Sequence, residues 1–163
     1  MNRLAKAKLL MLALLYSAGI CAQQTKDTAV VKKMVADKHY VFKAETVMPM
    51  GGTTRHLSTD YDVKITKNTV QAYLPYFGRA YSAPIGQSEG GIIFLSKNFE
   101  YTVTDKKGGW DITIKPKDVR DVQQLNFSIF NNGSTNLNVT STNRQPISFG
   151  GHIDPPDNRK KKS

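Results

Sequence analysis

From His39 onward, apolar and polar residues alternate with a period of two along most of the chain. Strict alternation places one face of a strand on a core and the other in water, which is typical of antiparallel sheet. Short turns containing glycine or asparagine separate several of these runs and indicate hairpins. Two longer connections are expected at 48–55 and 75–91. The runs that predict strands are 40–44, 61–66, 69–74, 99–104, 110–114, 125–129, 137–139 and 147–149.

One segment has helical periodicity. Between Thr25 and Lys38, apolar residues recur at helical spacing, and Thr25 or Asp27 can serve as the N-cap. The apolar stripe is narrow, which favours a helix lying on the sheet. The pattern as a whole predicts an α+β fold. An N-terminal helix packs on a mostly antiparallel sheet of about seven to nine strands, strongly curved or partly closed into a barrel.

The first 22 residues have a different character. Three basic residues within the first eight precede an apolar run at 9–16, and small residues follow it. A basic start, a short apolar stretch and a small-residue exit are typical of a secretory signal peptide. The apolar stretch is shorter than the roughly 20 residues that a membrane-spanning helix needs. We expect cleavage after Ala22, which makes Gln23 the first residue of the exported chain.

The alternative is lipidation of Cys21, the only cysteine of the chain. A lipoprotein site normally has a small residue before the cysteine, but Ile20 stands there instead. With cleavage after Ala22, the exported chain has no cysteine, so its stability must come from packing rather than from disulfides. The expected organisation is a signal peptide at 1–22, one domain at 23–153 and a disordered basic tail at 154–163.

The positive charge of the chain is concentrated at its two ends. The formal net charge is +10, but three basic residues lie in the signal peptide and four in the tail. The domain between them is mildly basic and mixed, whereas nucleic-acid binding needs basic residues clustered on one folded face. We therefore expect no nucleic-acid partner. Membrane contact is expected only through the basic tail or through a lipidated Cys21.

No constellation of residues indicates catalysis, a metal or a cofactor. The three histidines, His39, His56 and His152, lack the short spacings that metal sites use. Near pairs of aspartates, such as Asp60 and Asp62, alternate with apolar residues and so belong to the wet face of a strand. The sequence contains no nucleophile elbow and no phosphate-binding loop. We expect no enzyme activity, no metal and no cofactor.

The aromatic segment Tyr73–Tyr81 is the best candidate for a binding site. Aromatic side chains beside Arg79 suit contact with a partner protein or a sugar ring. The alternative is that these side chains plug the open end of the sheet. We expect a division of roles, in which Phe77 packs into the fold while Tyr76, Arg79 and Tyr81 contact the partner.

Three stretches of the chain carry a resemblance to known proteins. They are Tyr73–Tyr81, Phe99–Ile114 and Asn143–Gly151. Together they resemble domain-of-unknown-function family 4251, an uncharacterised family of exported bacterial proteins, and the similarity extends from Val30 to Ile153. The resemblance implies a protein of the periplasm or cell surface of Gram-negative gut-type bacteria. It implies no known activity and no catalytic residues.

A short motif near the N-terminus suggests a modification. Asp27-Thr28-Ala29 resembles the acceptor for O-glycosylation of exported proteins in some Gram-negative bacteria, with Thr28 as the acceptor. The alternative is an ordinary helix N-terminus.

Together the patterns predict a non-enzymatic binding or interaction protein of the periplasm or cell envelope. Its partner is expected to be an envelope protein or a glycan. Two other functions stay open. One is a carrier of a small apolar ligand, because barrels of this size can hold one. The other is an envelope hydrolase.

Overall fold

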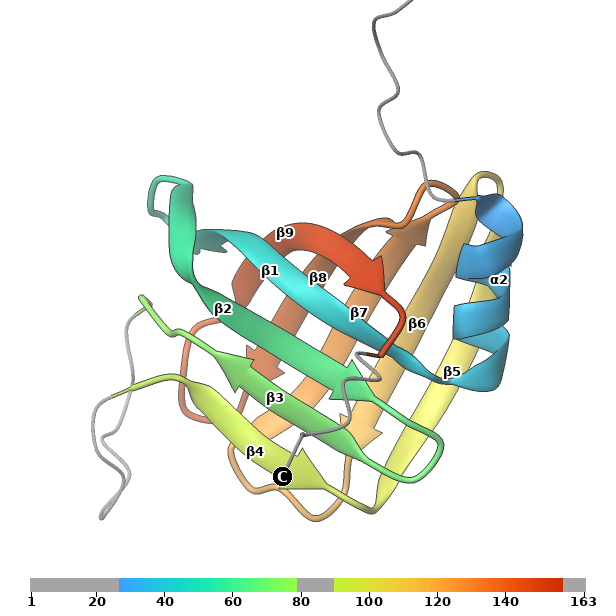
Figure 1. Cartoon of the computed structure of the whole chain (residues 1–163). Coiled ribbons are helices and arrows are strands. Elements are labelled where there is room, and N and C mark those ends of the chain that lie inside the picture. Colours follow the sequence, from blue (N-terminus) through green and yellow to red (C-terminus); the bar gives the residue numbers. More distant parts are fainter. Residues whose placement is uncertain (1–26, 79–89, 157–163) are drawn as a thin grey trace, which may run out of the picture.

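A nine-stranded antiparallel sheet curls into a nearly closed barrel in the computed structural model, which describes residues 27–78 and 90–156 (Figure 1). The strand order is β4-β3-β2-β1-β9-β8-β7-β6-β5. The two edge strands, β4 and β5, follow each other in the chain and diverge from a shared turn. The expected α+β fold is confirmed. The strands are β1 Tyr40–Pro49, β2 Arg55–Ile65, β3 Val70–Leu74, β4 Ile92–Ser96, β5 Phe99–Lys106, β6 Gly109–Pro116, β7 Val122–Phe130, β8 Ser134–Ser141 and β9 Ile147–Asp154.

The helix α2, Thr28–Asp37, lies beside β5 and β6 (Figure 1). The Asp27 carboxylate caps it by accepting a hydrogen bond from the Ala29 N–H at 3.0 Å. Lys38 ends it in the left-handed conformation, with φ of 51°. Of the two N-caps that the sequence allowed, Asp27 is confirmed. Within 27–78 and 90–156, no helix has the length and apolar character needed to cross a membrane. The residues of α2 that enter the core are Val31, Met34 and Val35.

A bulge in β1 helps the sheet to curl. β1 pairs with β2 on one side and with β9 on the other, and both ladders shift register between Ala44 and Thr46. Gly151 of β9 lies opposite Ala44, where a Cβ atom would overlap the carbonyl oxygen of Lys43. A bulge bends the strand and increases its twist, and glycine allows the close backbone approach. The bulge and this glycine therefore favour the curling of the sheet at β1 and β9.

Side chains fill the barrel interior. The Phe42 and Phe127 rings, from β1 and β7, meet edge to face with their centroids 5.8 Å apart. The hydroxyl of fully buried Tyr40 in β1 lies 3.1 Å from the hydroxyl of Tyr101 in β5. Because neither pair of strands is adjacent in the sheet, both contacts cross the interior. Trp110, which the alternation places on the core face, is partly buried and packs against the core.

The strand pattern differs from the sequence expectation in one important place. β4 is absent from the predicted strands because Ile92–Leu95 is an unbroken apolar run without alternation. Several boundaries also change. β1 and β2 both extend into the connection that was expected at 48–55. β9 continues to Asp154, which pairs with Val41, so the ladder extends into the segment expected as tail.

Candidate functional site

The two aromatic residues that follow β3 differ in burial: the first packs against the core and the second is exposed. Tyr76 is half-buried against the core, and its hydroxyl donates to the Gln145 carbonyl oxygen at 3.1 Å. Phe77 is 46% exposed, and the Arg55 guanidinium carbon lies 5.5 Å from the centroid of its ring. The prediction that Phe77 packs into the fold is therefore wrong, because Tyr76 occupies the position against the core.

The other predicted site residues are only partly described. Arg79 and Tyr81 lie outside the described residues, as do Cys21 and the cleavage point after Ala22. A binding role for Tyr76, Arg79 and Tyr81 therefore stays a prediction. Thr28 is exposed at the first position of α2. That position leaves its hydroxyl accessible, and its O-glycosylation also stays a prediction.

Arg144 links three separate parts of the chain beside Tyr76. Its guanidinium carbon lies 5.1 Å from the centroid of the Tyr76 ring, and its Nη1 donates to the Gly91 carbonyl oxygen at 3.0 Å. Its Nε is 3.3 Å from Oδ2 of Asp121, and the Arg144 side chain is only 10% exposed. A cation this deeply placed needs such partners. Arg144 therefore joins the end of β3 and the start of β4 to the β6–β7 connection.

Asp118 makes the corresponding link at the other end of β4. Its carboxylate accepts hydrogen bonds from the Ser96 hydroxyl and from the backbone N–H groups of Lys97 and Asn98. The Ser96 hydrogen bond, followed by the Lys97 bond, lowers the pKa of the Asp118 carboxyl below its usual value. The Lys117 N–H also donates to the Asn98 carbonyl oxygen at 2.8 Å. These bonds hold the β4–β5 turn against the β6–β7 connection.

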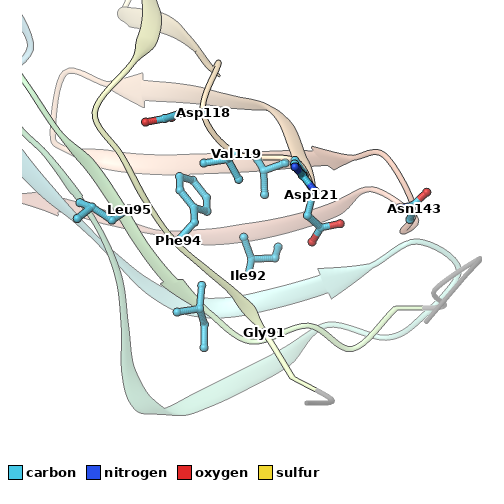
Figure 2. A pocket seen from close by; sticks show the side chains of 11 residues that line it. Gly91, Ile92, Phe94, Leu95, Asp118, Val119, Asp121 and Asn143 are labelled. Carbon is cyan, nitrogen blue, oxygen red and sulfur yellow. The ribbon is translucent and has the colours of Figure 1, made fainter. Parts of the chain in front are cut away.

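Between these two links, a groove of about 570 Å³ runs along the edge of β4 (Figure 2). Gly91–Leu95 forms one bank of this β4 groove, Asp118–Val122 forms the other, and Asn143 lies at one end. Successive side chains of a strand point to opposite faces, so a hollow that five consecutive residues line must follow the strand edge. Phe94 and Val119 come from opposite banks and lie close to each other in this view (Figure 2).

The edge of β4 that borders this groove has no strand partner among the described residues. β4 pairs with β3 on its other side. In the described part of the chain, no backbone hydrogen bond joins Ile92–Leu95 to Asp118–Val122. Alternate residues of an edge strand direct their N–H and C=O groups away from the sheet. The groove therefore contains unpaired backbone donors and acceptors.

Asp121, which lines the groove, has one carboxylate oxygen that is buried and unsatisfied. Its Oδ2 faces Arg144, but its Oδ1 is buried and has no hydrogen-bond partner among the described residues. A buried acceptor without a donor costs about 1–3 kcal/mol, and native structures contain few such atoms.

Large apolar side chains cover the outer surface of the same edge. Ile93 and Leu95 of β4 are 67% and 53% exposed, and Tyr73, the β3 partner of Ile93, is 44% exposed. We call these three residues the outer apolar face. The opposite edge strand, β5, carries polar side chains at its corresponding outward positions, which protects an edge from unwanted pairing. Those residues are Glu100, Thr102 and Thr104.

Charged residues elsewhere on the barrel pair with one another. Asp62 lies on the wet face of β2, as the alternation indicated, 3.4 Å from the Lys43 ammonium. His152 lies between the carboxylates of Glu45 and Asp154, at 2.9 and 3.1 Å. Within the described ranges, no group of three or more His, Cys, Asp and Glu side chains is arranged to hold a metal ion. The Lys43–Asp62 and Glu45–His152 contacts join neighbouring strands of the barrel surface.

Reasoning from the sequence did not find the β4 groove. Its two banks lie more than twenty residues apart in the chain, and only the fold brings them together. One signal was present in the sequence. The unbroken apolar run of Ile92–Leu95 contradicts a strand with one wet face, and an apolar outward face at a sheet edge is the reason.

Comparison with known proteins gives a family and a related structure. The model of the family described as Domain of unknown function (DUF4251) matches residues 22–153. Among solved structures, the chain is similar to a DUF4251 family protein from Bacteroides eggerthii DSM 20697, with 17% identity and a TM-score of 0.55. That similarity covers 82% of this chain and 92% of the other, and at this identity it supports the fold alone. A search of curated proteins found no match.

Proposed function

The chain belongs to the DUF4251 family, and on that premise we propose that it is an exported, non-enzymatic interaction module of the periplasm or cell surface. The observation that carries this proposal is the outer apolar face of Tyr73, Ile93 and Leu95 at an open sheet edge. Neighbouring exposed apolar side chains are typical of protein contact sites. The partner in this proposal is an envelope protein.

Export rests on the pattern of residues 1–22. A basic start and a short apolar run support secretion, and we expect the native protein to begin at Gln23. Intact-mass measurement of protein purified from its own cells tests this start. A mass that includes acyl chains on Cys21 would contradict it and would indicate a membrane-tethered lipoprotein.

The interaction role is tested at the outer apolar face. A photo-reactive benzoylphenylalanine replaces Leu95, and cells are irradiated to form crosslinks in the native envelope. We expect one defined crosslinked partner, and we expect Ile93→Lys to reduce its yield at least tenfold. The matched control is the same photo-reactive residue at Val103, which is 40% exposed on the other edge strand. Equal crosslinking from both positions would contradict a specific contact at β4.

The observations do not favour the two other functions. A carrier needs an open interior, whereas the described aromatic and aliphatic side chains meet across this one, as Phe42 and Phe127 do. A glycoside hydrolase needs one carboxyl with a raised pKa to act as the general acid. Asp118 lines the β4 groove beside Asp121, but its hydrogen bonds lower its pKa.

A further inference from the structure

We propose that the β4 groove binds an extended peptide segment of the partner, which adds to β4 as a further strand. This inference rests on the interaction role proposed above and specifies the chemistry of the partner. The outer apolar face alone fits a contact between folded surfaces. The groove adds unpaired backbone groups along β4, and these call for a different kind of ligand.

The backbone of β4 determines the type of ligand. Ile92–Ser96 pairs with β3 on one side, and its other side borders the groove. Unpaired N–H and C=O groups recur along an edge strand at the repeat of an extended chain, because alternate residues face the same way. An extended polypeptide matches this repeat and forms a ladder of main-chain hydrogen bonds. Neither a sugar ring nor a rigid small molecule presents donors and acceptors at that repeat.

The second bank of the groove favours a single extended segment over a second copy of this protein. Two folded barrels that pair edge to edge need unobstructed access to both edges. Here Asp118–Val122 runs along the β4 edge and leaves a space of about 570 Å³ between the two banks. The Ser96–Asp118 contact at one end and the Arg144–Gly91 contact at the other hold the banks together. A flexible segment fits between such banks, whereas a folded domain does not.

The apolar lining of the groove predicts what the segment carries. Phe94 and Val119 are both half-buried and provide apolar surface from opposite banks (Figure 2), which favours an apolar side chain packed against them.

The probe for this inference is a library of random twelve-residue peptides displayed on phage, selected against the purified chain that starts at Gln23. We expect enriched peptides with apolar residues at alternate positions. A synthetic copy of the strongest binder is then added, and hydrogen–deuterium exchange is followed across the protein. We expect slower exchange at backbone amides within Ile92–Ser96 and at none in β5.

Val119→Trp is the decisive variant, because it fills the groove without altering the outer apolar face. Because Val119 is partly buried against the core, the variant is first checked for a cooperative unfolding transition, and we expect the folded variant to bind the selected peptide at least tenfold more weakly. Val103→Trp, on the other edge strand, is the matched control and leaves binding unchanged. A second variant, Val119→Arg, gives the same loss of binding if the tryptophan variant proves unstable.

The possible results separate this inference from the interaction role. If Ile93→Lys abolishes crosslinking to the native partner but Val119→Trp leaves it intact, the interaction role stands and strand addition is wrong. If no peptide is enriched, or if the bound peptide protects amides outside β4, strand addition is also wrong. A dimer in light scattering that Val119→Trp converts to a monomer would identify a second copy as the occupant and overturn the proposal.

Discussion

At the scale of single residues, Tyr40 and Tyr101 show what burial does to a polar side chain. Burial, with the neighbouring Tyr101, raises the pKa of Tyr40 well above its usual value, and burial raises the pKa of Tyr101 to about 12. Each hydroxyl is the partner of the other at 3.1 Å. The pair satisfies two hydroxyls inside an apolar core, where a lone hydroxyl would be costly.

This pair predicts a loss of stability in alkaline solution. An unfolded tyrosine releases its proton near pH 10, whereas folded Tyr101 keeps its proton to about pH 12. Between these values the folded state binds more protons than the unfolded state, so the free energy of unfolding falls as pH rises. The contribution of Tyr101 to the free energy of unfolding is complete below about pH 10 and is lost as pH rises through about 12. Urea unfolding at several pH values measures this loss. A free energy of unfolding that stays constant from about pH 10 to about pH 12 would contradict the raised pKa of Tyr101.

The same pair predicts an asymmetric mutational result. Tyr101→Phe leaves the buried Tyr40 hydroxyl without its partner, and we expect a loss of about 1–3 kcal/mol in the free energy of unfolding. Replacing both tyrosines by phenylalanine removes both polar groups and should recover most of that loss. Urea unfolding of the single and double variants checks this expectation. A double variant less stable than the single one would show that the hydroxyl pair itself stabilises the fold.

Truncating Trp110 should destabilise the fold less than its position in the alternation suggests. It lies at the start of β6, in phase with Ile112 and Ile114, but it is only partly buried. We expect Trp110→Ala to cost less than the about 3–5 kcal/mol that truncation of a fully buried aromatic ring costs. Phe127→Ala, at a fully buried ring, is the control and should reach that range. Equal losses for the two variants would place Trp110 in the core.

At the scale of elements, the end of β3 shows how one proline redirects a chain. Leu74 is the last inward residue of the strand, and Pro75, which has no N–H to donate, is also buried. After it, Tyr76 lies against the core and Phe77 faces outward. The order of the two rings depends on the backbone path after Pro75, which alternation does not describe.

This arrangement predicts opposite results at neighbouring positions. Phe77→Ala should change the free energy of unfolding by less than about 1 kcal/mol, as exposed positions usually do. Leu74→Ala, at a side chain that is 1% exposed, should cost about 2–5 kcal/mol. Chemical denaturation of both variants provides the measurement. If Phe77→Ala lowers the free energy of unfolding as much as Leu74→Ala does, the Phe77 ring packs against the core in solution.

At the scale of the whole molecule, two kinds of contact hold the barrel together: backbone ladders between strands, and hydrogen bonds at the ends of the β4 groove. Backbone ladders join eight pairs of neighbouring strands, from β4 to β5 around the sheet. At the two ends of the β4 groove, in the described residues, other hydrogen bonds form the link to the β6–β7 connection. Asp118 and Lys117 bond to the β4–β5 turn, and Arg144 bonds to Gly91 and Asp121. The β4 edge is therefore the place where the barrel can accept another strand.

The strand order predicts a gradient of hydrogen exchange in the unliganded protein. Amides of β4 lie on an edge strand paired on one side, whereas those of β9 lie between β1 and β8. Local opening at an edge breaks fewer contacts, so we expect amides of β4 to exchange at least tenfold faster than those of β9. Exchange followed by mass spectrometry measures both. Equal protection in β4 and β9 would show that the β4 edge is already covered in solution.

The sequence by itself determined the type of sheet. Alternation in runs such as Tyr61–Ile65 and Phe99–Val103 reflects the two faces of a strand, which depend only on local backbone geometry. Helix α2 and its Asp27 N-cap also depend only on residues close in sequence, because the capping hydrogen bond spans two residues. The family resemblance also came from continuous stretches of sequence, and the family match confirms it.

The tertiary structure alone decided which distant residues meet. The position of β1 between β2 and β9 places Tyr40 opposite Tyr101, and the β6–β7 connection beside β4 creates the groove. The apolar run Ile92–Leu95 gave no alternation because both of its faces are apolar, so it was missed as a strand. Side-chain contacts across a barrel depend on strand order and curvature, which no local pattern encodes. The unpaired edge of β4 and the unsatisfied oxygen of Asp121 exist only in the folded chain, because each depends on what lies beside it.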